Sequence, residues 1–139
     1  MRLPDGTDDA VAALFADAER TLEDRLGIEL VELSAEHSVA TMPVQGNTQT
    51  IGILHGGAHG VLGETLASLA SIVHAGPGRT ARGIELSASH TRSADTGTVT
   101  ATCDAISLGR TLCVHEVVVR DEQGRRLSTV RVTNLIRSA

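Results

Sequence analysis

Aromatic residues and lysine are almost missing from this chain. The sequence holds one Phe and no Trp, Tyr or Lys. The core must therefore be built from Leu, Val, Ile and Ala, and a surface that stacks on single-stranded nucleic acid is not expected. The basic residues are all Arg and are scattered rather than clustered, and the formal net charge is -5. Neither nucleic acid nor an anionic membrane is an expected partner of such a surface.

Long apolar runs are missing too. No stretch approaches the roughly 18 apolar residues of a membrane span, and residues 1–9 have no apolar centre of the kind found in a signal peptide. A cytoplasmic protein is therefore expected. Cys103 and Cys113 could face each other across a hairpin centred near Gly109, so a disulfide is geometrically possible. In a reducing compartment, two buried free thiols are the expected state.

The length limits the chain to one compact domain. With 139 residues and 41% hydrophobic content, it can bury a real core but cannot form two ordinary domains, so a single domain over residues 1–139 is expected. Helical spacing of apolar residues predicts an N-terminal helix over about 8–26, ended by Gly27. The domain core is then expected over about 27–136, and it begins with a strand or a hairpin over 28–43.

The most apolar segment, residues 57–74, carries large side chains around most of its circumference. This pattern is typical of a central helix packed on several sides. Strand patterns separated by turn-like sequences follow it, at residues 82–92, 96–107, 111–120 and 125–136. One core helix and a sheet large enough to wrap around it predict an α+β domain.

The start of this helix has the features of a ligand site. His55, Gly56 and Gly57 stand where the first backbone N–H groups of the helix are unpaired and lie in a partial positive field. Glycine lets a ligand come close, so this end can hold a carbonyl oxygen that gains negative charge. The glycines do not form a P-loop, because the Lys and Ser/Thr of that motif are missing.

Glu64 is the acidic residue of the otherwise small and apolar stretch 52–71. Together with Gly60 and Ser68 it forms a stripe at i, i+4 and i+8 along one side of the helix. Two interpretations of its carboxylate remain open. It pairs with an Arg or reaches solvent at the edge of the core, or it is a nucleophile or general base held partly out of water.

Helix geometry adds a condition to the second interpretation. Gly56 and Glu64 are eight residues apart, which corresponds to about 12 Å along a helix. This distance is too long for the Gly56 N–H and the carboxylate to act on one carbonyl carbon. If both act, they must come from two chains whose helices run antiparallel across a two-fold axis.

The run from Gln49 to Ser68 resembles the signature of hotdog-fold acyl-CoA thioesterases. It contains Gly-Ile-Leu-His-Gly-Gly-Ala and Leu-Gly-Glu-Thr-Leu-Ala-Ser in the matching register. The similarity is to the branch with the Arthrobacter-type 4-hydroxybenzoyl-CoA thioesterase and the enterobactin-pathway proofreading thioesterase. The PaaI-like phenylacetate-pathway thioesterases share the His-Gly-Gly start but usually have Asp where this chain has Glu64. The similarity covers about residues 27–136 and continues through 83–92, 108–110 and 121–126.

The resemblance implies a hotdog fold, in which a curved antiparallel sheet of about five to six strands wraps around the long helix. Family members form homodimers that assemble into homotetramers. In that branch, the glutamate matching Glu64 attacks the thioester or activates water, and the N–H matching Gly56 of the other subunit polarises the carbonyl. The residue matching Gln49 contacts the thioester region, and the hydroxyl matching Ser68 helps to place the water.

Further residues are expected to contact substrate. His55 either caps the loop by hydrogen bonding to backbone or, by the resemblance, orders the active-site loop beside the thioester. His90 alternates with apolar residues of its strand, which puts it on the inward face near the strand end, and the resemblance implies that it lines the acyl pocket. Gly57 and Gly60 are expected to let the substrate come close.

Coenzyme A carries phosphates, for which Arg offers a planar donor fork. Any one turn arginine could simply be solvated, but some of the arginines at strand ends and turns are expected to hold the nucleotide end; the candidates are Arg92, Arg110, Arg125 and Arg126. No His, Cys and Asp set has metal-ligand spacing, so no metal is expected. No cofactor is expected either, since coenzyme A is part of the substrate.

The sequence thus predicts a thioesterase that hydrolyses a small acyl- or aroyl-CoA, or an acyl carrier thioester. The alternative is a hotdog protein that binds acyl-CoA or an acyl carrier without hydrolysis. Hydratase or dehydratase chemistry is disfavoured, because the hotdog relatives with that chemistry usually carry a different His/Asp arrangement.

Overall fold

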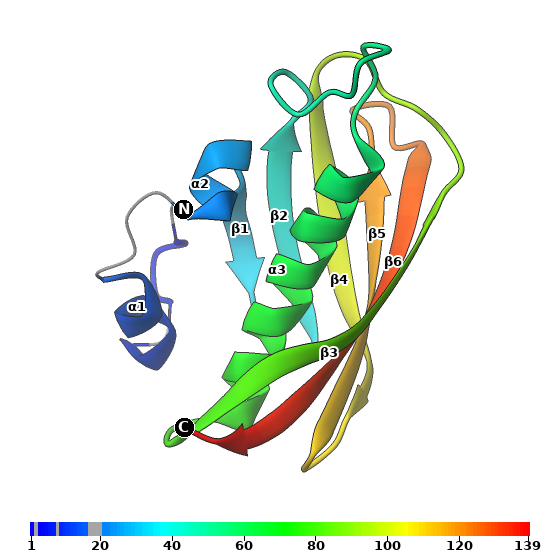
Figure 1. Ribbon diagram of the computed structural model, residues 1–139. Coiled ribbons are helices and arrows are strands. Elements are labelled where there is room, and N and C mark those ends of the chain that lie inside the picture. The colour runs from blue at the N-terminus through cyan, green and yellow to red at the C-terminus, as the bar shows by residue number, and fades with distance from the viewer. Residues whose placement is uncertain (2, 8, 17–20) are drawn as a thin grey trace.

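A six-stranded antiparallel sheet curves around one long helix (Figure 1). The computed structural model describes residues 1, 3–7, 9–16 and 21–139. The strand order in the sheet is β1-β2-β4-β5-β6-β3. The strands are β1 (Glu29–Leu33), β2 (His37–Pro43), β3 (Arg79–His90), β4 (Thr98–Leu108), β5 (Leu112–Arg120) and β6 (Arg126–Ser138). The predicted α+β arrangement is confirmed, and the segment after Gly27 is a hairpin.

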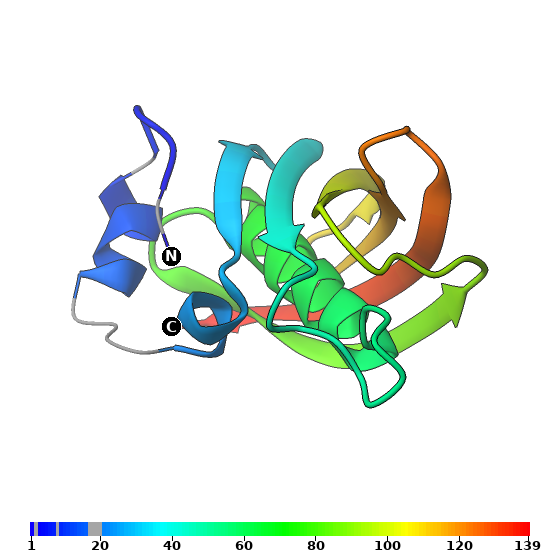
Figure 2. The same ribbon diagram turned by 90° about the horizontal axis from the view of Figure 1, so that it is seen from above.

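The central helix, α3 (Gly56–Ala75), is the one predicted from the apolar segment. It begins after the extended residue His55 and ends at Gly76, whose φ of 72° is in the left-handed region. Figure 2 shows α3 enclosed between β1 and β2 on one side and β3 on the other. Aliphatic side chains of helix and sheet fill the space between them, among them Leu62, Leu66, Ala70, Met42, Val99, Val117 and Val130.

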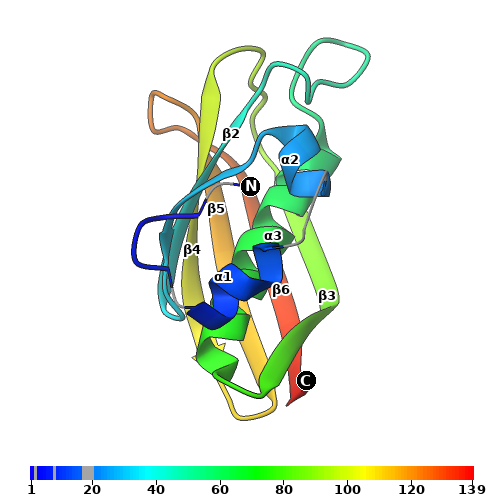
Figure 3. The same cartoon turned by 90° about the vertical axis from the view of Figure 1, so that its left-hand side faces the viewer.

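The N-terminal helix differs from the prediction. In place of one helix over 8–26, the structure has α1 (Asp9–Phe15) and α2 (Leu22–Leu26), while Asp8 and residues 17–20 lie outside the described residues. Thr21 is extended, with ψ of 172°, and forms a reciprocal capping box with Asp24. This local capping starts a new helix and prevents a continuous one. Gly27 ends α2 as predicted, and Figure 3 shows both short helices in front of α3.

The two cysteines do not face each other. Cys103 pairs with Val117 across the β4–β5 hairpin, whereas Cys113 pairs with Leu108 near the turn. Both thiols are free and buried, so the free-thiol expectation is confirmed and a disulfide is excluded by register. Within the described ranges, no helix is both long and apolar enough to cross a lipid bilayer.

The helix α3 lies unusually close to β6. A Cβ atom added at Gly63 would be only 2.9 Å from Cβ and Cγ1 of Val130, whereas one added at Gly60 would meet no heavy atom within 4 Å. The close contact between helix and sheet therefore lies at Gly63, and the space beside Gly60 is open in one chain.

These two glycines make a matched pair for a stability test. We expect Gly63→Ala to destabilise the protein by about 1–3 kcal/mol, because the added methyl group pushes α3 away from Val130. Gly60→Ala is expected to stabilise it by up to about 1 kcal/mol through helix propensity alone. Equilibrium unfolding in urea measures both, and equal effects of the two substitutions would contradict the assigned packing.

Candidate active site

The loop between β2 and α3 folds back on itself before the helix begins. The Gln49 N–H donates to the Ile53 carbonyl at 2.8 Å, and the His55 N–H donates to the Asn47 carbonyl at 2.9 Å. The side chain of Asn47 ties the loop to the end of β2 by donating to the Pro43 carbonyl at 2.9 Å. Gln49 is therefore held, half-buried, in the loop that leads into α3.

His55 caps the helix, as one of its two interpretations proposed. Its Nδ1 accepts a hydrogen bond from the Gly57 N–H at 2.8 Å. The next N–H groups, of Ala58 and His59, donate to the His55 carbonyl. The N–H of Gly56 donates to no residue that the structure describes. One backbone donor at the positive end of a 20-residue helix is thus available to a ligand.

The ring of His90 covers this helix start. A Cβ atom added at Gly56 would lie 2.9 Å from His90 Nε2, so only glycine leaves the ring in place. The other ring nitrogen, Nδ1, is 2.9 Å from the Ser128 hydroxyl. His90 is therefore turned towards α3, but it is exposed rather than buried, because β3 is the edge strand of the sheet.

His59 lies behind His90. The two rings stack with centroids 5.3 Å apart, and His59 is 2% exposed, with no partner for Nδ1 among the described residues. Burial, followed by the nearby charge of His90, lowers the pKa of His59 to about 4. This pair was not predicted from the sequence, in which the two histidines are 31 residues apart.

Glu64 belongs to a second group, two turns further along α3. Its carboxylate lies over Gly83 of β3, with Oε1 3.0 Å from where a Cβ atom of that residue would be. In one chain Glu64 is exposed, and no ion pair to it occurs among the described residues. In a single chain the carboxylate therefore reaches solvent at the edge of the core, which is the first of its two interpretations, and its role as nucleophile or general base stays a prediction. It reaches solvent because β3 covers only one side of it.

Ser68 lies one turn after Glu64 and is joined to the sheet. Its hydroxyl donates to Oδ1 of Asn134 at 3.1 Å. Asn134 pairs with Gly83 in the β3–β6 ladder and is fully buried. The sequence analysis missed Asn134, although an amide on the inward face of an otherwise apolar strand was a signal that could have found it.

The structure thus brings the predicted residues together in two groups rather than one. His55, Gly56, Gly57 and His90 gather at the start of α3, and Glu64 lies with Ser68 beside Gly83. Figure 1 shows α3 as one uninterrupted helix, so the two groups are held about 12 Å apart.

The four arginines predicted as a phosphate-binding group do not form one cluster in the chain. Arg110 lies in the turn before β5, while Arg125 and Arg126 lie in the turn after it. Arg125 is paired with Asp121 at 2.7 Å, and Arg92 follows β3 at the same end of β6 as Arg126. In a single chain the length of β5 separates Arg110 from the other three, and phosphate binding by some of these arginines stays a prediction.

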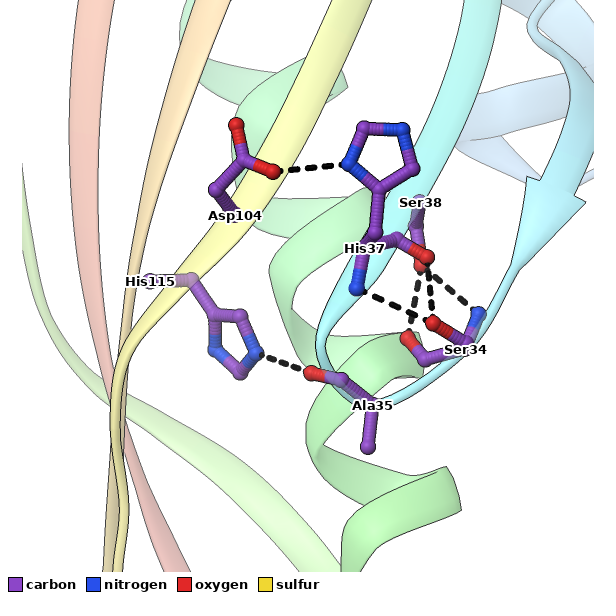
Figure 4. A network of polar contacts seen from close by, with 6 residues as sticks. All are labelled: Ser34, Ala35, His37, Ser38, Asp104 and His115. Carbon is purple, nitrogen blue, oxygen red and sulfur yellow. Dashed lines mark hydrogen bonds and ion pairs between the residues drawn. The ribbon is translucent and has the colours of Figure 1, made fainter.

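Two other histidines, His37 and His115, form hydrogen bonds at the opposite end of β2. Figure 4 shows a hydrogen bond between His37 and Asp104 and another between His115 and the Ala35 carbonyl in the β1–β2 turn. The bond to Asp104 raises the pKa of His37, and burial lowers that of His115. No group of three or more potential metal ligands occurs in the part of the chain that the structure describes.

Comparisons with known proteins agree with this architecture. Residues 51–128 match the family described as Thioesterase superfamily. The proofreading thioesterase EntH of Cronobacter turicensis is 42% identical over 125 residues, which cover 89% of this chain and 91% of that protein. A putative esterase of Deinococcus radiodurans is 46% identical over 114 residues, 81% of this chain and 72% of the relative.

Solved structures give the same result. A mutant thioesterase from Pseudomonas aeruginosa superposes with a TM-score of 0.86 and 32% identity, covering 96% of both chains. A thioesterase from Haemophilus influenzae gives 0.83 and 32%, covering 91% of this chain and 87% of the other. The fold is therefore the hotdog fold of thioester hydrolases. The chain belongs to the thioesterase superfamily.

The buried His59 predicts a pH dependence of stability. Its pKa is about 4 in the folded protein and near 6.5 otherwise, so the unfolded chain takes up the proton first as the pH falls. The stabilisation is complete above about pH 6.5 and declines towards pH 4, by at most about 1.4 kcal/mol per pH unit. His59→Gln should remove this decline, as measured by urea unfolding at several pH values.

A matched control is His37→Gln. The Asp104 carboxylate raises the pKa of His37, so this exposed pair contributes stability at low pH that is lost as the pH rises. The two variants should therefore change the pH dependence in opposite directions. Stability curves of wild type and His59→Gln that run parallel between pH 7 and pH 4 would contradict the buried, neutral state of His59.

Proposed function

We propose that the protein hydrolyses a small acyl- or aroyl-CoA, or an acyl carrier thioester, with Glu64 as nucleophile or general base. The observation that carries the proposal is the unpaired Gly56 N–H at the glycine-rich start of α3, on the same helix as an exposed carboxylate that lies beside the edge strand. An oxyanion donor and a base are the two groups that acyl transfer requires.

The chemistry follows from these two groups. The Gly56 N–H donates a hydrogen bond to the carbonyl oxygen of the thioester and stabilises the negative charge that develops on it. Glu64 either attacks the carbonyl carbon, forming an anhydride that water then hydrolyses, or takes a proton from the water that attacks. The carbon–sulfur bond breaks, and the thiol leaves with one proton. His90 and Gly57 line the helix start where the acyl group enters, and Gln49 faces the thioester from the loop.

The edge strand supports a site shared by two chains. In β3, Ile84 and Leu86 are 57% and 41% exposed, and the strand has a free edge. An uncovered apolar edge favours pairing with a second copy. Within one chain, Gly83 is next to Glu64 and His90 is next to Gly56. If two β3 strands pair antiparallel with Gly83 opposite the partner subunit's His90, then Glu64 comes close to the partner subunit's Gly56. The two-fold axis then passes between Leu86 and Ser87.

The proposal also covers the oligomeric state, the location in the cell and the residues that bind the nucleotide. The protein is a homodimer that assembles into a homotetramer, acts in the cytoplasm and uses neither metal nor cofactor. Two free buried thiols fit a reducing compartment. Arg92, Arg125 and Arg126, at one end of β6, hold the nucleotide phosphates, with Arg110 contributing from another turn. A Streptococcus pneumoniae protein solved with coenzyme A shares the fold, with a TM-score of 0.72 and 21% identity.

Replacement of Glu64 tests the chemistry. We expect Glu64→Gln to lower kcat by about 100-fold or more, because the amide can neither attack nor accept a proton. Release of free thiol from benzoyl-, phenylacetyl- and short acyl-CoAs measures it. Glu29→Gln, at an exposed carboxylate of β1, is the control and should retain full activity. A well-folded Glu64→Gln variant with undiminished turnover would contradict the role of Glu64. Saturable binding of CoA esters by wild type without turnover would favour the alternative, a protein that binds thioesters without hydrolysing them.

Complementation tests the shared site. Gly56→Pro removes the N–H at a first helical position that proline tolerates, and His55 before it is already extended, with ψ of 133°. Gly56→Ala is its control, since it adds the same Cβ contact to His90 but keeps the N–H. Mixed dimers of Glu64→Gln and Gly56→Pro keep one intact site, so coexpression should restore about a quarter of wild-type turnover. A mixture as inactive as its components would show that each site lies within one chain.

A further inference from the structure

Asn134 is out of place in the inward face of β6. Its neighbours on this face towards the end of the strand, Val130, Val132 and Ile136, are apolar and buried, as is expected of a strand packed on a core helix. Asn134 itself is 0% exposed. An amide in such a position costs free energy unless both its polar atoms are bonded, so a residue chosen for stability alone would be Val or Ile.

Of the two polar atoms of the Asn134 amide, one forms a hydrogen bond within the described residues. Oδ1 accepts the hydrogen bond from Ser68 at 3.1 Å. Nδ2 is buried and has no hydrogen-bond partner among residues 1, 3–7, 9–16 and 21–139. A buried donor without a partner costs roughly 1–3 kcal/mol. The position therefore carries a cost that the packing of β6 does not explain.

The amide lies beside the proposed base. Oδ1 of Asn134 and Oε1 of Glu64 both approach the same point above Gly83, at 3.7 and 3.0 Å from where a Cβ atom would stand. Ser68 follows Glu64 by one helical turn and therefore lies on the same side of α3. Gly83 leaves room for both oxygens, because a Cβ atom at this position would press on the Glu64 carboxylate and shift it by a few tenths of an ångström.

The bond to Asn134 also fixes how Ser68 can act. A hydroxyl has one hydrogen to donate and two lone pairs to accept with. Since the hydrogen is directed to Asn134 Oδ1, the lone pairs of Ser68 are left to accept from a water molecule beside Glu64. Without Asn134, the hydroxyl can turn back to the Glu64 backbone carbonyl one turn earlier, as serines in helices commonly do.

We propose that Asn134 is a positioning residue for thioester hydrolysis, which orients the Ser68 hydroxyl so that Ser68 and Glu64 hold the attacking water between them. This inference rests on the proposed function and adds a residue of β6, the strand that faces Glu64 and Ser68 of α3. Asn134 does not touch the substrate. It acts through Ser68, and its effect falls on the chemical step rather than on binding.

Two substitutions test the role, Asn134→Leu and Asn134→Ala. The first replaces the amide by an apolar group of similar size, and the second removes it without any risk of overpacking. In both, kcat should fall roughly 10- to 100-fold while KM stays within about twofold, because only the placement of water is disturbed. Asn134→Leu should also unfold at a urea concentration equal to or higher than wild type, since it removes an unsatisfied buried donor.

A double-mutant cycle with Ser68→Ala separates positioning from a general effect on the fold. If Asn134 acts through Ser68, then Asn134→Leu in the Ser68→Ala background should lower kcat no further. Ser71→Ala is the matched control, because it removes another buried hydroxyl of α3, which donates to the Ala67 carbonyl at 2.8 Å and has no hydrogen bond to Asn134 among the described residues. This control should keep the wild-type kcat.

The outcomes are distinct. Unchanged kcat in Asn134→Leu and Asn134→Ala, or losses that add fully to that of Ser68→Ala, would overturn the role of Asn134 while leaving the proposed function intact. A loss of stability in both variants with no change in kcat would make Asn134 a structural residue. A wild-type protein that releases no thiol from any thioester would overturn the proposed function, and the inference with it.

Discussion

The close approach of α3 to β3 and β6 is the constraint on which the site depends. The helix can lie this near because Gly63 meets Val130 and Gly83 leaves space under Glu64. Because the contact is so close, the short side chain of Ser68 reaches Asn134 on the sheet directly. A larger residue at Gly63 would push the helix away from β6 and weaken that contact, and one at Gly83 would displace the Glu64 carboxylate. The packing of the core and the geometry of the base are therefore set by the same contact.

The stiffness of α3 then determines how the two halves of the site can meet. An α-helix does not shorten, so the Gly56 N–H and the Glu64 carboxylate stay about 12 Å apart in every chain. The strand β3 touches both halves, at Gly83 and at His90. A two-fold axis at the middle of this edge strand exchanges its ends, and this exchange is what places a donor from one chain beside a base from the other.

Periodicity was enough to predict α3, the four later strands and the stop at Gly27, since each depends on neighbours in the sequence. It could not show the break at Thr21, where a short-range capping box outweighs the apolar spacing on either side. Nor could it show the contact of Ser68 with Asn134, which joins residues 66 apart through sheet register. Nor could it decide between the two interpretations of Glu64, because an apolar helix is expected to be covered on all sides, whereas the β3 edge leaves one side open.

That exposure is itself consistent with a site completed by assembly. A carboxylate surrounded by water is well solvated, and its hydration must be removed before it can attack a carbonyl or take a proton from a positioned water. In one chain nothing removes it, because β3 borders Glu64 on one side only. A partner paired along β3 covers the open side, so the same contact that delivers the oxyanion donor also strips water from the base and strengthens every charge interaction within the site. Pairing along β3 thus couples dimer formation to catalysis. A separate chain contains both the Gly56 N–H and the Glu64 carboxylate but lacks the partly dry environment in which they react.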